Sequence, residues 1–195
     1  MFRILISVVA LAALSQPALA DDHADYAVGL GFSPFGGSIS FGYHPSASTT
    51  VFTTFGGAPE MEAPFKVDVD GTEYTQKGGS SWMGVFLNHR PFEDSQWFRF
   101  ATGIGIGGIQ GELDDGNGNK YAVEYNENPV GYMGFGVGLG TSEGFTFGFD
   151  MGALYTSGPE ITVLEGNGAD LDGIQDNAFF GNVLPNFQLS AGYNF

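Results

Sequence analysis

Apolar residues alternate with small or polar residues, with a period of two, along most of the chain. In the clearest run, residues 145–155, Phe and Met occupy odd-numbered positions, and Thr, Gly and Asp lie between them up to residue 152. Successive side chains of a β-strand point to opposite faces, so this pattern predicts strands with one apolar face. Eight segments carry the pattern: residues 26–32, 39–44, 50–56, 83–87, 98–106, 133–139, 145–155 and 187–195.

The make-up of the two faces indicates how the strands are oriented. The apolar face is bulky and often aromatic, whereas the other face is largely Gly, Ser and Thr. A soluble barrel packs its bulky side chains inward, but here they are expected to point outward into lipid. The sequence therefore predicts an all-β fold: a transmembrane antiparallel up-and-down β-barrel of eight strands. A soluble β-sandwich is the alternative.

The connections between these segments alternate in length, which agrees with a barrel. Short turns are expected at residues 45–49, 90–95 and 140–144, and long acidic loops at residues 57–79, 112–128 and 156–182. Outer-membrane barrels have short periplasmic turns and long outer loops. Within the first long loop, Asp70-Gly71 suits a tight turn, so a small hairpin is expected there.

The first twenty residues have the form of a secretory signal peptide. Arg3 precedes an apolar run, and Ala18-Leu19-Ala20 supplies a small-x-small cleavage site. We therefore predict a signal peptide over residues 1–20 and an outer-membrane β-barrel over residues 21–195. The predicted location is the outer membrane of a Gram-negative-type cell, with outer-membrane lipid and lipopolysaccharide as neighbours.

The last segment ends in alternating apolar residues, with Tyr193 two positions before the final Phe195. This ending resembles the C-terminal assembly signal of outer-membrane barrels. The resemblance implies that the barrel-assembly machinery is a partner and that these two residues are read by it.

Charge narrows the choice of ligands. Six Lys and Arg face 22 Asp and Glu, for a net charge of −16, and there is no cysteine. Nucleic acid is excluded as a partner because binding phosphates requires clustered cations. Fifteen of the acids are expected to ring the outer mouth: Glu60, Glu62, Asp68, Asp70, Glu73, Glu112, Asp114, Asp115, Glu124, Glu127, Glu160, Glu165, Asp170, Asp172 and Asp176. Such a ring attracts cations; a solvated acidic fringe is the alternative.

No cofactor, metal site or enzymatic activity is predicted. The run 114–119 is rich in oxygen ligands but lacks the glycine and glutamate spacing of an EF-hand. His23 lies in the N-terminal tail, and His44 and His89 fall at periplasmic strand ends. None is within reach of a nucleophile at the outer rim, so a catalytic triad is not expected.

The inward face combines many glycines with a few large side chains. Trp82, Phe86, Trp97 and Tyr132 are expected to point inward, where they either plug the axis or border a narrow wet passage. Arg99 and Asp150 also point inward by parity, at similar depths. A salt bridge across the lumen is the favoured interpretation, and a charge filter is the alternative.

Four stretches resemble the CarO family of small outer-membrane channels: residues 67–74, 90–92, 134–136 and 152–161. The resemblance implies an eight-stranded barrel linked to slow uptake of small, often basic, solutes such as ornithine-like amino acids. Our leading hypothesis is a narrow passive channel for small cationic or zwitterionic solutes. The alternative is a closed structural or interaction barrel whose acidic loops meet divalent ions, lipopolysaccharide or a partner.

Overall fold

The computed structural model describes residues 23–92, 95–126, 129–177 and 179–195, so the predicted signal peptide lies outside the described residues. Most of the described chain is β-strand, and no helix in it is long and apolar enough to cross a bilayer. The elements are β1 (Tyr26–Ser33), β2 (Gly36–Ser46), β3 (Thr49–Val69), β4 (Thr72–His89), β5 (Phe98–Asp114), β6 (Lys120–Tyr125), β7 (Val130–Gly138), β8 (Gly144–Tyr155), β9 (Glu160–Glu165), α2 (Leu171–Asp176) and β10 (Val183–Asn194).

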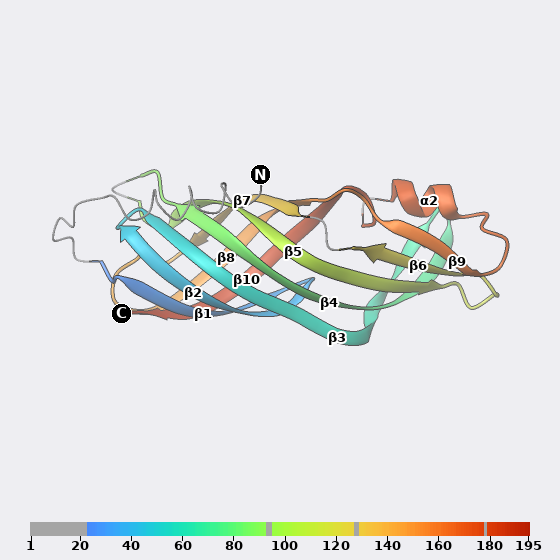
Figure 1. Ribbon diagram of the computed structural model, residues 1–195, viewed down its shortest axis with the longest axis horizontal. Helices are drawn as coiled ribbons and strands as arrows, with labels where there is room; N and C mark the ends of the chain where they lie inside the picture. Colours follow the sequence, from blue (N-terminus) through green and yellow to red (C-terminus); the bar gives the residue numbers. More distant parts are fainter. Residues whose placement is uncertain (1–22, 93–94, 127–128, 178) are drawn as a thin grey trace.

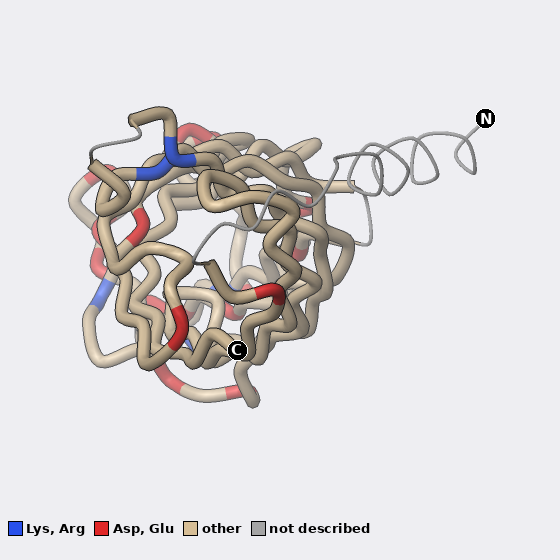
Figure 2. The backbone as a smooth tube through the Cα atoms, turned by 90° about the vertical axis from the view of Figure 1, so that its left-hand side faces the viewer, with Lys and Arg blue, Asp and Glu red and all other residues tan. Residues whose placement is uncertain are grey.

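Eight strands of the described chain close into an antiparallel ring. Their order is β1-β2-β3-β4-β5-β7-β8-β10, and β10 pairs with β1 to complete it. Figure 2 shows this ring end-on. Every ring strand thus has a hydrogen-bonded neighbour on both sides, so no unpaired edge is left in hydrocarbon. The predicted fold class and all eight predicted strands are confirmed.

The bulky side chains of the ring point outward. Phe145 is 76% exposed and Phe32 is 69% exposed, whereas Thr54 and Asp150 on the opposite face are buried. The third predicted segment had an ambiguous phase, and the burial of Thr50 and Thr54 now places its even-numbered positions inside. The exposed apolar side chains include Tyr26, Val28, Leu30, Phe32, Ile39, Phe41, Phe55, Met83, Val85, Phe100, Ile104, Ile106, Met133, Phe135, Val137, Phe145, Phe147, Phe187, Leu189 and Tyr193. An exterior of this kind suits lipid rather than water.

Three strands continue well beyond the thickness of a bilayer. A membrane-spanning strand needs about 9–11 residues, whereas β3, β4 and β5 have 21, 18 and 17. In Figure 1 they run past the ring to the end that carries β6, β9 and α2. We call this the outer end, and the opposite end, which carries the C-terminus, the periplasmic end.

The prediction of a loop over residues 57–79 was wrong, because β3 and β4 pass through it as a paired hairpin. Register shifts between Ala58 and Met61 and between Glu62 and Lys66 interrupt the period of two, which hid these strands. The small hairpin inside the segment is confirmed. Its turn, Asp70-Gly71, has positive φ at both residues, 51° and 87°, as a type I′ turn requires.

A hydrophobic core outside the membrane ring joins the long connections. Its buried members come from β3, β4, β5, β6, α2, the segment after α2 and the start of β10: Val67, Val69, Tyr74, Leu113, Tyr121, Val123, Tyr125, Ile174, Phe180 and Leu184. Phe35, in the turn between β1 and β2, and Leu154, near the end of β8, pack against it. Both lie where the ring ends, so this outer core sits over the outer mouth of the barrel.

Ile174→Ala is expected to release α2 from the outer core. Ile174 is completely buried, and truncation of a buried isoleucine to alanine typically costs about 2–5 kcal/mol. Limited proteolysis should cut faster between β9 and β10 in this variant, while the heat-modifiable migration of the ring persists. Leu164→Ala is the control, because Leu164 is 49% exposed. Equal cleavage rates in the two variants would contradict the packing described.

Candidate functional site: the barrel interior

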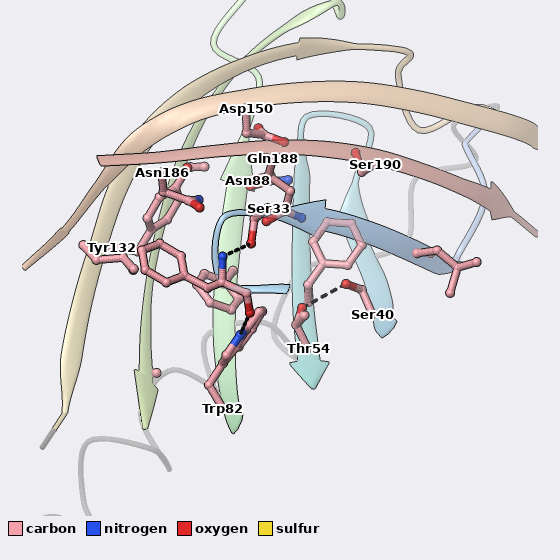
Figure 3. A pocket seen from close by; sticks show the side chains of 18 of the residues that line it. Ser33, Ser40, Thr54, Trp82, Asn88, Tyr132, Asp150, Asn186, Gln188 and Ser190 are labelled. Carbon is pink, nitrogen blue, oxygen red and sulfur yellow. Dashed lines mark hydrogen bonds between the residues drawn. The ribbon is translucent and has the colours of Figure 1, made fainter. Parts of the chain in front are cut away.

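The ring encloses a cavity of about 190 Å³. Polar side chains from β2, β3 and β10 border it: Ser40, Thr54, Asn186, Gln188 and Ser190. Figure 3 shows these side chains together with Tyr132, which lies beside Asn186, and Trp82, which lies at the lower edge of the view. Ser40 and Thr54 hydrogen-bond to each other through their hydroxyls at 3.0 Å. The cavity therefore offers both hydroxyl and amide groups to a small occupant.

Aromatic side chains narrow the outer half of this cavity. Phe86 contacts Trp82 edge-on, with ring centroids 6.4 Å apart, and Tyr132 at 5.9 Å. Trp82 Nε1 donates a hydrogen bond to the carbonyl oxygen of Phe35 at 3.0 Å, and Ser80 Oγ donates to the same oxygen at 2.7 Å. The turn between β1 and β2 is thereby held against the aromatic side chains, directly beneath the outer core.

Trp97 does not belong to this group, so its predicted inward position was wrong. Its side chain is 59% exposed and contacts Phe98 at the periplasmic end. It precedes β5, whose first residue is Phe98. The alternation of side chains between two faces holds only within a strand. It therefore does not predict the direction of Trp97, which lies in the turn before β5.

The glycines of the inner wall lie beneath the large inward side chains. A Cβ atom at Gly103 would overlap the ring of Phe86, and one at Gly148 would overlap the guanidinium of Arg99. The glycines thus let bulky side chains lie flat against neighbouring strands. Large side chains thus cross part of the lumen, and a cavity remains between them.

Arg99 and Asp150 form a bidentate ion pair within the lumen. Nε donates to Oδ1 at 2.9 Å and Nη2 donates to Oδ2 at 2.6 Å. Both residues are buried, at 7% and 8% exposure. Since the guanidinium occupies both carboxylate oxygens, the pair is a well-satisfied strut between β5 and β8, the salt bridge favoured from the sequence.

Glu127 lies outside the described residues; the other predicted acidic residues lie on the outer extension, and the structure pairs several of them. Lys77 contacts Glu60 at 2.8 Å, with Glu62 and Glu112 opposite it in the neighbouring strands. Lys120 contacts Asp114 at 3.2 Å. These contacts raise the pKa of both lysines. Glu160 begins β9 and is exposed.

Backbone and side-chain amides hold the acids of the β5–β6 turn. A hydrogen bond from the backbone amide of Gly116 is the main cause that lowers the pKa of Asp114, and Lys120 lowers it further. Hydrogen bonds from Asn119 lower the pKa of Asp115. These bonds are internal to the turn, which agrees with a structural role. Among the described residues, no three acidic or histidine side chains gather in a way that could hold a metal ion.

A second group of acids meets at the tip of the outer extension. Asp68 and Asp70 of the β3–β4 hairpin line a shallow depression with Asp172 and Asp176 of α2. Asp170, just before the helix, accepts a hydrogen bond from Tyr74 Oη at 2.6 Å. Burial is the main cause that raises the pKa of the Tyr74 hydroxyl, and the hydrogen bond to Asp170 raises it further. Asp170 therefore ties α2 to the outer core.

The C-terminal residues pack against the ring at the periplasmic end. The Tyr193 ring contacts Phe145 at 5.2 Å, and the Phe195 ring contacts Tyr26 at 6.2 Å. Both side chains are also partly exposed on the lipid-facing side. Their recognition by the assembly machinery stays a prediction.

Several cavity residues were not identified from the sequence. Phe35 lies between two predicted strand segments, and only the folded structure shows its carbonyl oxygen accepting two hydrogen bonds. Asn186 and Gln188 share the inward parity of β10, and that parity was a usable signal. Arg90 was assigned to the turn after β4, yet it lines the cavity.

Comparisons with known proteins agree with this geometry. No family model and no curated protein matches the chain. Among solved structures, Acinetobacter baumannii CarO matches with a TM-score of 0.65 and 13% identity over 88% of this chain and 98% of that one. CarO2 from the same organism matches at 0.66 and 14% identity, covering 89% and 98%. A major outer membrane protein from Thermus thermophilus matches at 0.54 and 13% identity, covering 88% and 99%.

Fold and interior together define a small outer-membrane β-barrel. Within that class, the chain has a CarO-like fold, which confirms the predicted resemblance at the level of structure. The fold and the apolar exterior agree with the predicted location in the outer membrane.

Asp150→Asn is expected to destabilise the barrel by about 3–5 kcal/mol, because it leaves the buried Arg99 guanidinium without its carboxylate. Urea unfolding in lipid vesicles, followed by tryptophan fluorescence, measures the loss. The double variant Arg99→Met/Asp150→Leu removes both charges and should recover most of the stability. A single variant as stable as the wild type would show that the ion pair contributes nothing.

Proposed function

We propose that this protein is a narrow passive channel for small solutes whose closed form is the one described. The carrying observation is the internal cavity, in which Ser40, Thr54, Asn186 and Gln188 present polar groups to a space bounded by aromatic rings. An eight-stranded barrel is small enough for its own side chains to fill. A retained cavity with polar groups on part of its wall therefore supports a role in holding or passing a small solute rather than a purely structural or enzymatic role.

Charge within and outside the lumen supports zwitterionic solutes in preference to simple cations. The acids of the outer extension attract the ammonium group of an approaching solute. Inside, the cavity is lined by two arginines, Arg90 and Arg99, and one acid, Asp150. The excess positive charge repels a solute that carries only positive charge. A small amino acid carries an ammonium group, which the outer acids attract, and a carboxylate, which the inner arginines attract.

The outer core supports the second candidate, a closed structural or interaction barrel. Its buried side chains lie over the mouth, so passage requires them to move. In this alternative the acidic tip beside α2 would meet divalent ions, lipopolysaccharide or a partner. In both candidates Tyr193 and Phe195 serve assembly and the exterior contacts outer-membrane lipid.

Removal of the part of the outer core that follows β8 distinguishes the two candidates. A variant in which a short Gly-Ser linker replaces residues 158–181 lacks β9 and α2 and should admit small solutes faster than the wild type. Swelling of liposomes that contain each protein, measured in glycine, measures this uptake. Ethanolammonium and glycolamide, which are similar to glycine in size, report the effect of charge, and glycine is expected to enter fastest of the three.

The matched control is Leu164→Ser/Phe179→Ser, which changes two exposed side chains of the same segment and should swell like the wild type. If the shortened variant, once shown to be folded by its heat-modifiable migration, is as impermeable as empty liposomes, the channel proposal fails. The closed interaction barrel would then remain.

A further inference from the structure

Arg90 places a second guanidinium inside the barrel at its periplasmic end. The residue follows directly after β4, and its backbone amide donates to the carbonyl oxygen of Ser48 at 2.7 Å. Its side chain is drawn into the lumen, where the residue is only 5% exposed and lines the cavity. Long cationic side chains are almost never buried to this degree unless they are paired.

The hydrogen bonds of this guanidinium to described residues leave one buried donor without a partner. Nη1 donates to Thr50 Oγ1 at 3.3 Å, and Nε, which is buried, has no hydrogen-bond partner in the described part of the chain. A guanidinium carries five N–H donors. Thr50 is itself completely buried and also bonds to His44 Nδ1 at 2.8 Å, so it is a fixed part of the wall.

The charges around Arg90 do not neutralise it. Its ionised neighbours are Arg99, which repels it, and Asp150, which attracts it. Both oxygens of Asp150 already accept hydrogen bonds from Arg99. Arg90 makes no ion pair with any described residue. Among the described residues, no acid is therefore left to compensate the positive charge of Arg90, and a buried charge of this kind is costly unless a counter-ion meets it.

We propose that Arg90, with Thr50 as a neighbouring wall residue, forms a binding site for a small monovalent anion at the periplasmic end of the cavity. The ligand is chloride or the carboxylate of a small organic acid, since a guanidinium binds both. The proposal goes beyond the channel function, because the site exists in the closed barrel whether or not any solute passes. It also explains how a buried arginine is retained where no described acid pairs with it.

Anion binding to the detergent-solubilised mature protein tests the proposal. Chloride NMR line broadening is followed at constant ionic strength, with gluconate as the bulky replacement anion, and formate and acetate are added as competitors. The wild type should broaden the chloride signal, and Arg90→Gln should weaken binding by at least about tenfold, as expected for the loss of a charged hydrogen-bond donor. Competition by formate identifies a carboxylate site, and its absence identifies a halide site; both outcomes support the proposal.

Two further variants keep the result interpretable. Arg90→Lys retains the charge without the planar fork, so it should keep chloride binding but lose affinity for formate; it also serves if Arg90→Gln fails to fold. Glu93 and Asp94 follow Arg90 closely in the sequence and lie outside the described residues. The double variant Glu93→Gln/Asp94→Asn removes both acidic groups as possible partners of Arg90, and it should bind chloride like the wild type. Binding that is absent from the wild type, or that appears only in this double variant, overturns the proposal. Neither outcome depends on liposome swelling.

Discussion

Closure of the antiparallel ring in an apolar solvent is the constraint on which the rest of this structure depends. Hydrocarbon offers no hydrogen bonds, so each backbone amide in the span needs a partner from a neighbouring strand. Pairing of β1 with β10 provides the last set of partners. Once the ring is closed, alternation leaves only two environments, and each side chain faces either lipid or lumen. The bulky outward residues and the small inward ones follow from this division.

The narrow lumen then determines how the remaining large side chains are accommodated. Phe86, Arg99 and Asp150 all project inward, and glycines on adjacent strands provide the space they occupy. The ion pair joins β5 to β8, and the aromatic side chains close the outer half. The cavity that remains is bounded by polar groups, by aromatic rings and by the guanidinium of Arg90, which forms no ion pair with a described residue. The same glycine-rich wall that permits tight packing therefore also creates the candidate site.

The ring could be predicted from sequence because its signal is local and repeated: the period of two in segments such as 98–106 and 145–155 is imposed by lipid at every second position. The outer extension gave no such signal. There the chain is surrounded by water, bulges interrupt β3 near Ala58 and Glu62, and the core forms from residues as distant as Val67 and Phe180. The Phe35 carbonyl contacts and the buried Arg90 likewise depend on tertiary placement that no local pattern encodes.

The most direct test of the outward orientation uses single cysteines, since the chain has none of its own. Nitroxide labels are placed one at a time at residues 145–151 of β8 in lipid vesicles, and their collision rates with oxygen and with a water-soluble nickel chelate are measured. The account predicts that labels at Phe147 and Phe149 collide preferentially with oxygen, as lipid exposure requires, while those at Thr146 and Gly148 do not. Loss of this period of two, or nickel-accessible labels at the phenylalanine positions, would contradict it.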